Sequence, residues 1–149
     1  LRGVIAVGAS TYGDSVWSNS ANGSLLDPYS QENRSYPNQK PEVSAPGVLL
    51  FSTTSTQIEP PYAYSTGTSD STVLVSGALA LILELHGTAL AGDDGVINSE
   101  EMEIVKRTLA SSCSKTAISG SPHDEKGGYG LLDAVQWASD IAFELNIAD

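Results

Sequence analysis

The longest apolar stretch of the chain runs from Val73 to Leu85 and has hydrophobic side chains at most positions. Hydrophobic residues on all faces are typical of a helix that is buried nearly all round. We therefore predict a central helix over Ser69–His86, ended by Gly87, with His86 as a donor near its C-terminus. The run is shorter than the roughly 20 residues that a bilayer requires, so the pattern predicts no membrane-spanning segment.

A second helix is predicted over Asn98–Ala110, because apolar residues recur there at helical spacing on one face. The residues of this face are Met102, Val105 and Leu109. Asn98 can cap the helix, and Glu101 at the third helical position can complete a capping box. Glu103 and Arg107 are four positions apart and are predicted to form an ion pair. The pattern indicates an amphipathic helix at the surface.

A third helix is predicted over Leu131–Leu145, with one apolar stripe formed by Leu131, Ala134, Val135, Ala138, Ile141, Ala142 and Leu145. Compact apolar runs at Val4–Gly8 and Val48–Ser52 predict buried strands. Ser10–Pro46 lacks periodicity and is interpreted as a long surface excursion, and Thr53–Gly67 as a polar loop. Strands that precede helices predict an α/β fold.

Composition is typical of a globular domain and excludes some partners. The chain has 149 residues, 40% of them hydrophobic and 17% charged, with a net charge of −11. Binding to nucleic acid or to anionic membranes is not expected at this charge. The single cysteine, Cys113, cannot form an internal disulfide and is interpreted as a structural thiol, since no metal-ligand spacing surrounds it.

The strongest chemical candidate is Ser69, which lies where a small-residue turn meets the apolar helix. Backbone N–H groups at a helix start have no intrahelical acceptor, and the macrodipole favours negative charge there. A serine hydroxyl at that point can attack a carbonyl whose oxyanion meets these donors. Gly67 would allow a substrate backbone to approach closely. The alternative is that a Ser or Thr of this turn simply caps a core helix.

Four segments resemble one protein family. Gly67-Thr-Ser-Asp-Ser-Thr-Val-Leu-Val-Ser-Gly77 resembles, without a gap, the nucleophile motif G-T-S-M-A-x-P-H-V-A-G of the subtilisin-like serine proteases, the subtilases. Lys40-Pro-Glu-Val-Ser-Ala-Pro-Gly47 is similar to the K-P-D-x-x-A-P-G segment that precedes it. Val4–Ala9 is similar to a strand of that family, and Gly128–Ala134 to its closing helix start. The order and spacing of all four segments agree with the family.

The resemblance implies an α/β fold that is the C-terminal portion of a subtilisin-like three-layer parallel-sheet domain. Residues 1–149 would form one partial catalytic domain that carries the nucleophile. The family's catalytic aspartate, base histidine and oxyanion asparagine lie upstream of the segment that matches Val4. We therefore expect a serine endopeptidase fragment that is inactive alone and acts together with the N-terminal half of the same domain.

The same resemblance assigns roles to the residues of the turn. Ser69 would be the nucleophile that forms an acyl-enzyme. Thr68 and Gly67 would shape the oxyanion and substrate-entry side, and Ser65 and Thr66, with Tyr62, the leaving-group side. The implied substrate is a polypeptide, and the implied location is secreted or at the cell surface. No metal or cofactor is expected in this segment, although subtilases often bind calcium elsewhere.

The motif also departs from the family. Asp70 stands at the methionine position, and Val73 and Leu74 replace the family's Pro-His. A carboxylate close to a developing oxyanion would oppose the charge that catalysis must stabilise. A second hypothesis is therefore a non-catalytic subtilase-like module that binds through its acidic surface and the Leu25–Gln39 excursion. An esterase is disfavoured because Asp70-Ser71 after Ser69 does not match the G-x-S-x-G elbow.

Three other candidate sites are weaker. His86 would lie roughly 25 Å from Ser69 along one continuous helix, whereas a base must lie about 3 Å from its nucleophile. His123 is interpreted as a solvated histidine of the Ser119–Gly128 loop. Asp93–Glu101 resembles half of a calcium-binding EF-hand loop, but helix capping explains the same residues.

Overall fold

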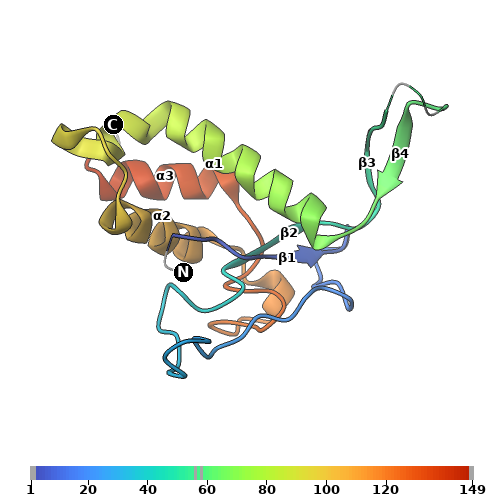
Figure 1. The fold of residues 1–149 in the computed structure, drawn as a ribbon, viewed down its shortest axis with the longest axis horizontal. Coiled ribbons are helices and arrows are strands. Elements are labelled where there is room, and N and C mark those ends of the chain that lie inside the picture. The colour runs from blue at the N-terminus through green and yellow to red at the C-terminus, as the bar shows by residue number, and fades with distance from the viewer. Residues whose placement is uncertain (1–2, 56, 58, 148–149) are drawn as a thin grey trace.

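The computed structural model describes residues 3–55, 57 and 59–147 and contains a small α/β body with a projecting hairpin (Figure 1). The strands are β1 (Val7–Ser10), β2 (Val43–Pro46), β3 (Leu50–Thr53) and β4 (Tyr62–Ser65). The helices are α1 (Thr68–Ala91), α2 (Ser99–Ser112) and α3 (Ala134–Glu144), with short 3₁₀ turns at Gly92–Asp94 and Thr116–Ile118. Helix α1 packs against β1, β2 and α3, and α2 packs against α3.

Strands β1 and β2 are parallel, with Val7 opposite Val43. The segment that precedes α3 extends this sheet, because the Ser44 N–H donates to the Gly130 carbonyl at 2.9 Å and the Leu132 N–H donates to the Ser44 carbonyl at 2.8 Å. The strand predicted at Val4–Gly8 is thus shifted to Val7–Ser10. Both strands end on the side of the molecule where α1 begins (Figure 1).

Strand β2 was not predicted, because it lies inside the segment interpreted as a surface excursion, Ser10–Pro46. Its apolar residues Val43 and Ala45 flank the polar Ser44, the polar Glu42 precedes the strand, and all four are fully buried. The hydrophobic pattern could not reveal the strand because polar side chains in it are buried with hydrogen-bond partners. The Ser44 hydroxyl, for example, donates to the Gly130 carbonyl at 3.1 Å.

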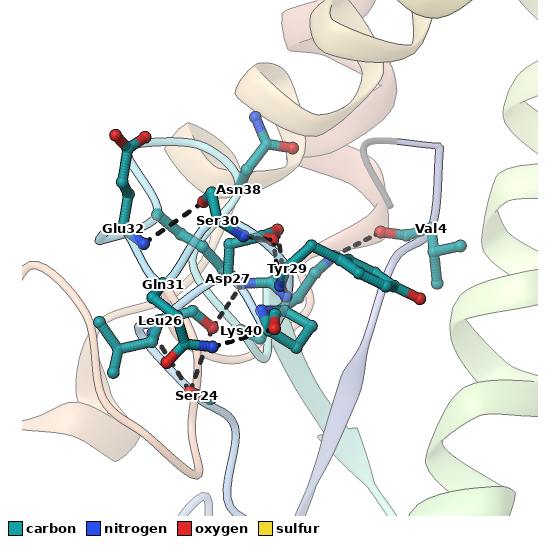
Figure 2. Close-up of polar contacts among 12 residues, drawn as sticks. Val4, Ser24, Leu26, Asp27, Tyr29, Ser30, Gln31, Glu32, Asn38 and Lys40 are labelled. Atoms are coloured by element: carbon teal, nitrogen blue, oxygen red, sulfur yellow. Dashed lines mark hydrogen bonds and ion pairs between the residues drawn. The ribbon is translucent and has the colours of Figure 1, made fainter.

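Glu42 is the centre of a buried charge network that ties β2 to its surroundings. One carboxylate oxygen pairs with the ammonium groups of Lys40 and Lys106, the latter at 2.6 Å. The other oxygen accepts the Ala6 N–H at 2.8 Å. The Lys40 ammonium also donates to the Val4 carbonyl at 2.6 Å (Figure 2). Burial lowers the pKa of Lys40, which the contact with Glu42 opposes.

The strand predicted at Val48–Ser52 is present as β3, shifted to Leu50–Thr53, but it is not buried, and the segment predicted as the loop Thr53–Gly67 contains strand β4. Strand β3 pairs with β4 in an antiparallel hairpin, and β4 is exposed along its whole length. The hairpin projects away from the helices (Figure 1). Its aromatic rings contact one another instead of a core: the Phe51 ring lies 5.6 Å from that of Tyr62 and 5.2 Å from that of Tyr64. Cross-strand aromatic pairs of this kind stabilise a sheet locally.

Helix α1 is longer and less buried than predicted. It has 24 residues and continues through Gly87 to Ala91, so neither the predicted helix stop nor the terminal position of His86 is correct. Its buried residues, Ser71, Val75, Ile82 and Leu90, lie on one side. The other side exposes large apolar residues: Val73, Leu74, Leu81 and Leu85. The prediction of burial all round is therefore wrong, since no residue that the structure describes covers that side.

Within the described residues, α1 is the one helix long and apolar enough to cross a membrane, with a mean hydropathy of 1.8 over its most apolar part. Length and composition alone give weak evidence, because the core helix of a water-soluble protein meets the same criterion. Only 17% of that apolar part is buried in this structure, and the buried side packs on β1, β2 and α3.

Helix α2 is predicted closely, including its capping box: Asn98 accepts from the Glu100 N–H, and Glu101 accepts from the Asn98 N–H at 2.9 Å. Val105 and Leu109 of its apolar face are completely buried. The predicted Glu103–Arg107 pair is wrong. Long-range partners replace it: Glu103 accepts hydrogen bonds from the Asn38 side chain, and Arg107 pairs with Glu144 of α3.

Helix α3 begins at Ala134 rather than at Leu131, because Leu131 and Leu132 bond to the sheet and Asp133 caps the helix. Ile141 of the predicted stripe is fully buried, whereas Val135 is 82% exposed. Trp137, which the stripe left out, is also completely buried. Its indole N–H donates to the Val105 carbonyl at 3.1 Å and fixes α3 on α2.

Candidate active site

The start of α1 lies at the carboxyl edge of the parallel pair β1–β2. Gly47, which follows β2, receives a hydrogen bond from the Gly67 N–H at 2.8 Å and donates one to the Ser10 carbonyl at 3.1 Å. The buried Ser71 hydroxyl donates to the Ala45 carbonyl at 2.9 Å. Two strands thus hold the first turn of α1 in place. Ligands of open parallel sheets bind outside the carboxyl ends of the strands, and Ser69 lies at this edge.

Ser69 is the second residue of α1 and is exposed. The residue at the N-cap of the helix is Gly67, and no side chain hydrogen-bonds to the backbone there. Neither Thr68 nor Ser69 therefore acts as a helix cap. In the described part of the chain, no group hydrogen-bonds with the Ser69 hydroxyl. An unengaged hydroxyl beside the free N–H groups of a helix start is the arrangement that nucleophilic attack with oxyanion stabilisation requires.

The glycine at the cap leaves open space in front of the serine. A Cβ added to Gly67 would have its nearest neighbour, the Ser69 backbone nitrogen, at 3.7 Å, which is ordinary contact. The position therefore has no internal packing reason to be glycine. An extended chain can approach the backbone here.

The remaining predicted site residues lie around this turn. Thr68 is the first residue of α1 and is half-buried, and its carbonyl accepts the Thr72 hydroxyl at 2.8 Å. Thr66 is exposed, and its hydroxyl accepts the Leu49 N–H at 2.9 Å. Ser65 ends β4 and donates its hydroxyl to the Asp70 carboxylate at 2.9 Å. Ser65, Thr66, Gly67, Thr68 and Ser69 thus form one contiguous surface at the start of α1.

The Asp70 contact bears on the departure from the family motif. Its carboxylate is held by Ser65, which precedes the turn, so β4 supplies a donor for this charge. Asp70 also lies in the first turn of α1, where a carboxylate is stabilised by the helix dipole. Two interactions other than a substrate contact therefore account for an aspartate at this position.

Two residues that support the site were not among the predicted candidates. A Cβ on Gly47 would lie 2.2 Å from the Ser71 hydroxyl oxygen and 2.7 Å from the Gly67 carbonyl oxygen, so only glycine fits. Ser71 is buried and links α1 to β2. The sequence signal for Gly47 was present, since this residue ends the Lys40–Gly47 segment.

Neither histidine of the chain can act on Ser69. His86 lies on the same unbroken helix, roughly 25 Å away. His123 is not a solvated loop residue as predicted: its Nε2 is hydrogen-bonded to the Pro41 carbonyl at 2.8 Å, and its ring packs on Tyr129. Pro41 precedes β2 and Ser69 lies beyond its other end, so roughly 15 Å of strand separates the two positions.

Metal-ligand clusters are not found among residues 3–55, 57 and 59–147, in which no three carboxylate, histidine or cysteine groups converge. In the segment that resembles part of a calcium loop, Asp94 accepts the Val96 N–H and Glu101 completes the capping box. Burial raises the pKa of Cys113 to about 12, and its thiol donates to the Leu109 carbonyl. This cysteine is therefore not a poised nucleophile.

The fold is similar to that of solved subtilisin-like proteases. The CspB protease of Clostridium perfringens has a TM-score of 0.68 at 22% identity, over 95% of this chain and 27% of that one. Fervidolysin of Fervidobacterium pennivorans, a keratinolytic enzyme related to subtilisin, has 0.61 at 23%, over 92% and 19%. The PatG macrocyclase in complex with a peptide has 0.63 at 18%, over 92% and 36%. These likenesses confirm the subtilisin-like α/β fold.

The chain spans between 19% and 44% of the length of the similar structures. A search of curated protein sequences finds no significant match to it. Residues 1–130 match the sequence model of the subtilase family, and this range includes the exposed serine at the start of α1 and the β2–Gly47 segment that holds it. The chain therefore belongs to the subtilase family.

Proposed function

We propose that this chain supplies the nucleophile of a serine endopeptidase. Ser69 Oγ attacks the scissile carbonyl carbon of a polypeptide while its proton passes to a histidine base that residues 1–149 do not provide. The developing oxyanion is stabilised by the N–H groups at the start of α1, supported by Thr68. The proton is then transferred to the leaving amine, and water hydrolyses the resulting acyl-enzyme. Ser65 and Thr66 line the leaving-group side.

The observation that carries this proposal is the exposed hydroxyl of Ser69 on a helix start that two strands hold. The chain has only two histidines, and both lie too far from Ser69 to act as its base. The catalytic histidine must then come from other polypeptide, and the family implies the N-terminal half of the same domain as the source of both the histidine and the aspartate. The apolar side of α1, with Val73, Leu74, Leu81 and Leu85 exposed, is a surface that such a half can cover.

The experiment compares the 149-residue chain alone with the intact protease that contains it. The isolated chain should hydrolyse peptide substrates at the uncatalysed rate. In the intact protease, Ser69→Ala should lower kcat by at least about 10⁴-fold, since removal of a triad member leaves only binding and oxyanion contributions. Ser76→Ala, an exposed serine two turns further along α1, is the control and should leave turnover unchanged. Turnover by the isolated chain that requires Ser69 would contradict the proposal.

A binding module without catalysis is the second candidate, and the Leu25–Gln39 excursion favours it. This excursion is ordered by its own polar contacts, with the Asp27 carboxylate accepting the N–H groups of Tyr29 and Ser30 (Figure 2). Backbone hydrogen bonds lower the pKa of Asp27. A polar pocket of about 220 Å³ lies between Asp27, Arg34 and Asn38. A module of this kind would bind its partner equally well after Ser69→Ala and would not react with a fluorophosphonate.

The location and the calcium requirement are proposed from family membership alone. We expect the intact protein to be secreted or at the cell surface, and any calcium to bind outside the present segment. Fractionation of cells and culture medium tests the location. A thermal melt of the intact protein with and without a calcium chelator tests the ion, and an unchanged Tm would exclude a structural calcium.

A further inference from the structure

A groove lies beside the turn formed by Ser65–Ser69, which we call the nucleophile turn. The groove is lined by Thr11–Asp14, Pro46 and Val48–Leu50. Its volume is about 610 Å³, and apolar side chains form most of its lining. Tyr12 is completely exposed at one wall, and Leu49 is 67% exposed at the other. Its lining includes Thr11, which follows β1, and Pro46, the last residue of β2, so the groove lies at the ends of these strands. Both strands end on the side of the molecule where α1 begins (Figure 1).

This groove shares one wall, the segment after β2, with the site around Ser69. The Leu49 N–H donates to the Thr66 hydroxyl at 2.9 Å, and the Gly67 N–H donates to the Gly47 carbonyl at 2.8 Å. The segment after β2 is thus a wall of the groove on one side and a support of the nucleophile turn on the other. Thr66 and Ser69 are three positions apart, which is at most about 11 Å of chain.

Two lining residues have a positive φ, which aspartate adopts readily but which is unusual for leucine. Leu49 has φ 55° and Asp14 has φ 57°, both in the left-handed region. A bulky apolar residue in this region is uncommon, and strain of this kind is concentrated at ligand sites. Leu49 nevertheless directs a largely exposed side chain into the groove rather than into the core.

Asp14 adds a charge to this apolar surface. In the described residues its carboxylate has no hydrogen-bond or ion-pair partner. It also lines a second pocket of about 310 Å³, which shares Pro46 with the groove and contains Asp133. The Asp133 carboxylate is already engaged, since it accepts the Gln136 N–H at 2.9 Å as the cap of α3. Asp14 is thus the uncompensated charge at the junction of the two pockets.

We propose that this groove binds the leaving-group side of an extended polypeptide substrate, with an apolar side chain over Leu49 and a neighbouring lysine or arginine at Asp14. The inference rests on the proposed function, which puts Thr66 on the leaving-group side. A polypeptide is the occupant because the groove shares a wall with the turn that precedes α1, on the side that the proposed function gives to the leaving group. An extended chain advances about 3.3 Å per residue, so the groove receives roughly the third to fifth residue after the scissile bond.

The test uses two dye-labelled peptides of about ten residues that differ only at the fourth residue after the scissile bond, lysine in one and glutamate in the other. Binding is measured by fluorescence anisotropy to the intact protease carrying Ser69→Ala, which prevents cleavage. The lysine peptide should bind about threefold more tightly than the glutamate peptide, the effect expected of an exposed ion pair. The difference should diminish at high ionic strength.

Asp14→Asn should reduce the ratio of the two affinities to about one. Asparagine tolerates the left-handed region, so the loop keeps its conformation. Asp93→Asn is the matched control, since Asp93 is exposed just beyond the far end of α1 and the change in net charge is the same. Leu49→Asn, also compatible with a positive φ, should weaken both peptides about fivefold and preserve the ratio.

The inference would be overturned if the protein with its native Asp14 bound the two peptides with equal affinity. It would also be overturned if Asp14→Asn left the ratio of the two affinities unchanged. The proposed function is judged separately, by peptide turnover in the protein with Ser69. If turnover is normal but the ratio does not respond to Asp14, the groove assignment alone fails. If no turnover occurs but the ratio responds as expected, the groove binds peptide and the protease assignment fails.

Discussion

The turn that carries Ser69 is held in place by contacts of the small residues Gly47 and Ser71. Gly47 fits between Ser71 and the Gly67 carbonyl, and Ser71 bonds back to the carbonyl of Ala45. At this scale the sequence could predict Ser69 and Gly67 as site residues, because a small-residue turn before an apolar helix places a hydroxyl beside the free N–H groups of the helix start. It could not predict the role of Ser71 or the contact between Ser65 and Asp70, because both are tertiary contacts.

Gly47→Ala should disrupt the nucleophile turn more than the fold. A methyl group at this position would lie 2.2 Å from the Ser71 oxygen and 2.9 Å from the Ala9 Cβ, so the start of α1 must shift. Overpacking of this kind costs about 1 to 3 kcal/mol in the free energy of unfolding. In the intact protease we expect kcat to fall at least about 100-fold, since misplacement by about 1 Å is sufficient for that loss. Gly77→Ala, with no atom near its added Cβ, is the control and should retain activity.

Cys113 should give the protein an alkaline stability limit. Burial raises its pKa from 9.0 to about 12. Because the folded pKa is raised, the stabilisation is fully present below pH 9 and is lost as pH rises towards 12. Cys113→Ala should therefore flatten the decline in unfolding free energy over this interval, as measured by urea titration at several pH values. Tyr129, whose pKa burial also raises to about 12, remains in the variant and limits the effect. An unchanged pH profile would contradict this assignment.

At the scale of elements, the fold depends on long-range partners that fix helices and strands in register. Helix α2 could be predicted almost to the residue, because its capping box and apolar face are encoded within one segment. Strand β2 and the β3–β4 hairpin could not, since one is stabilised by buried polar partners and the other by aromatic rings outside the core. The length of α1 was underestimated because a glycine inside a packed helix was interpreted as its end.

The charge network around Glu42 should be important for the placement of β2. Glu42→Gln leaves the ammonium groups of Lys40 and Lys106 without their shared carboxylate in a buried site. Loss of one partner from a buried ion cluster costs about 3 to 5 kcal/mol. Chemical denaturation should show this decrease in unfolding free energy, whereas Glu100→Gln, an exposed residue at the start of α2, should change it by less than about 0.5 kcal/mol. A small effect of Glu42→Gln would mean that the network does not anchor the strand.

At the scale of the whole molecule, two strands hold the start of α1 in place, while one side of the same helix is exposed and apolar. The core beneath α1 is continuous, with Val75, Ile82 and Leu90 packed among residues of β2, α2 and α3. The opposite side of α1 is apolar, as the hydrophobic pattern predicted, but it is exposed rather than buried. The pattern indicated apolar residues on every face of α1. It could not show that the residues of this chain cover only one of them.

The central claim is that Ser69 is a nucleophile whose base lies outside these residues. The most direct measurement is labelling by a fluorophosphonate, followed by mass spectrometry of the modified peptide. In the intact protease, one phosphonyl group per molecule should be found on Ser69, with none in the Ser69→Ala variant, and the isolated 149-residue chain should remain unlabelled. Absence of label in the intact protein, or stoichiometric label on any other residue, would contradict the account.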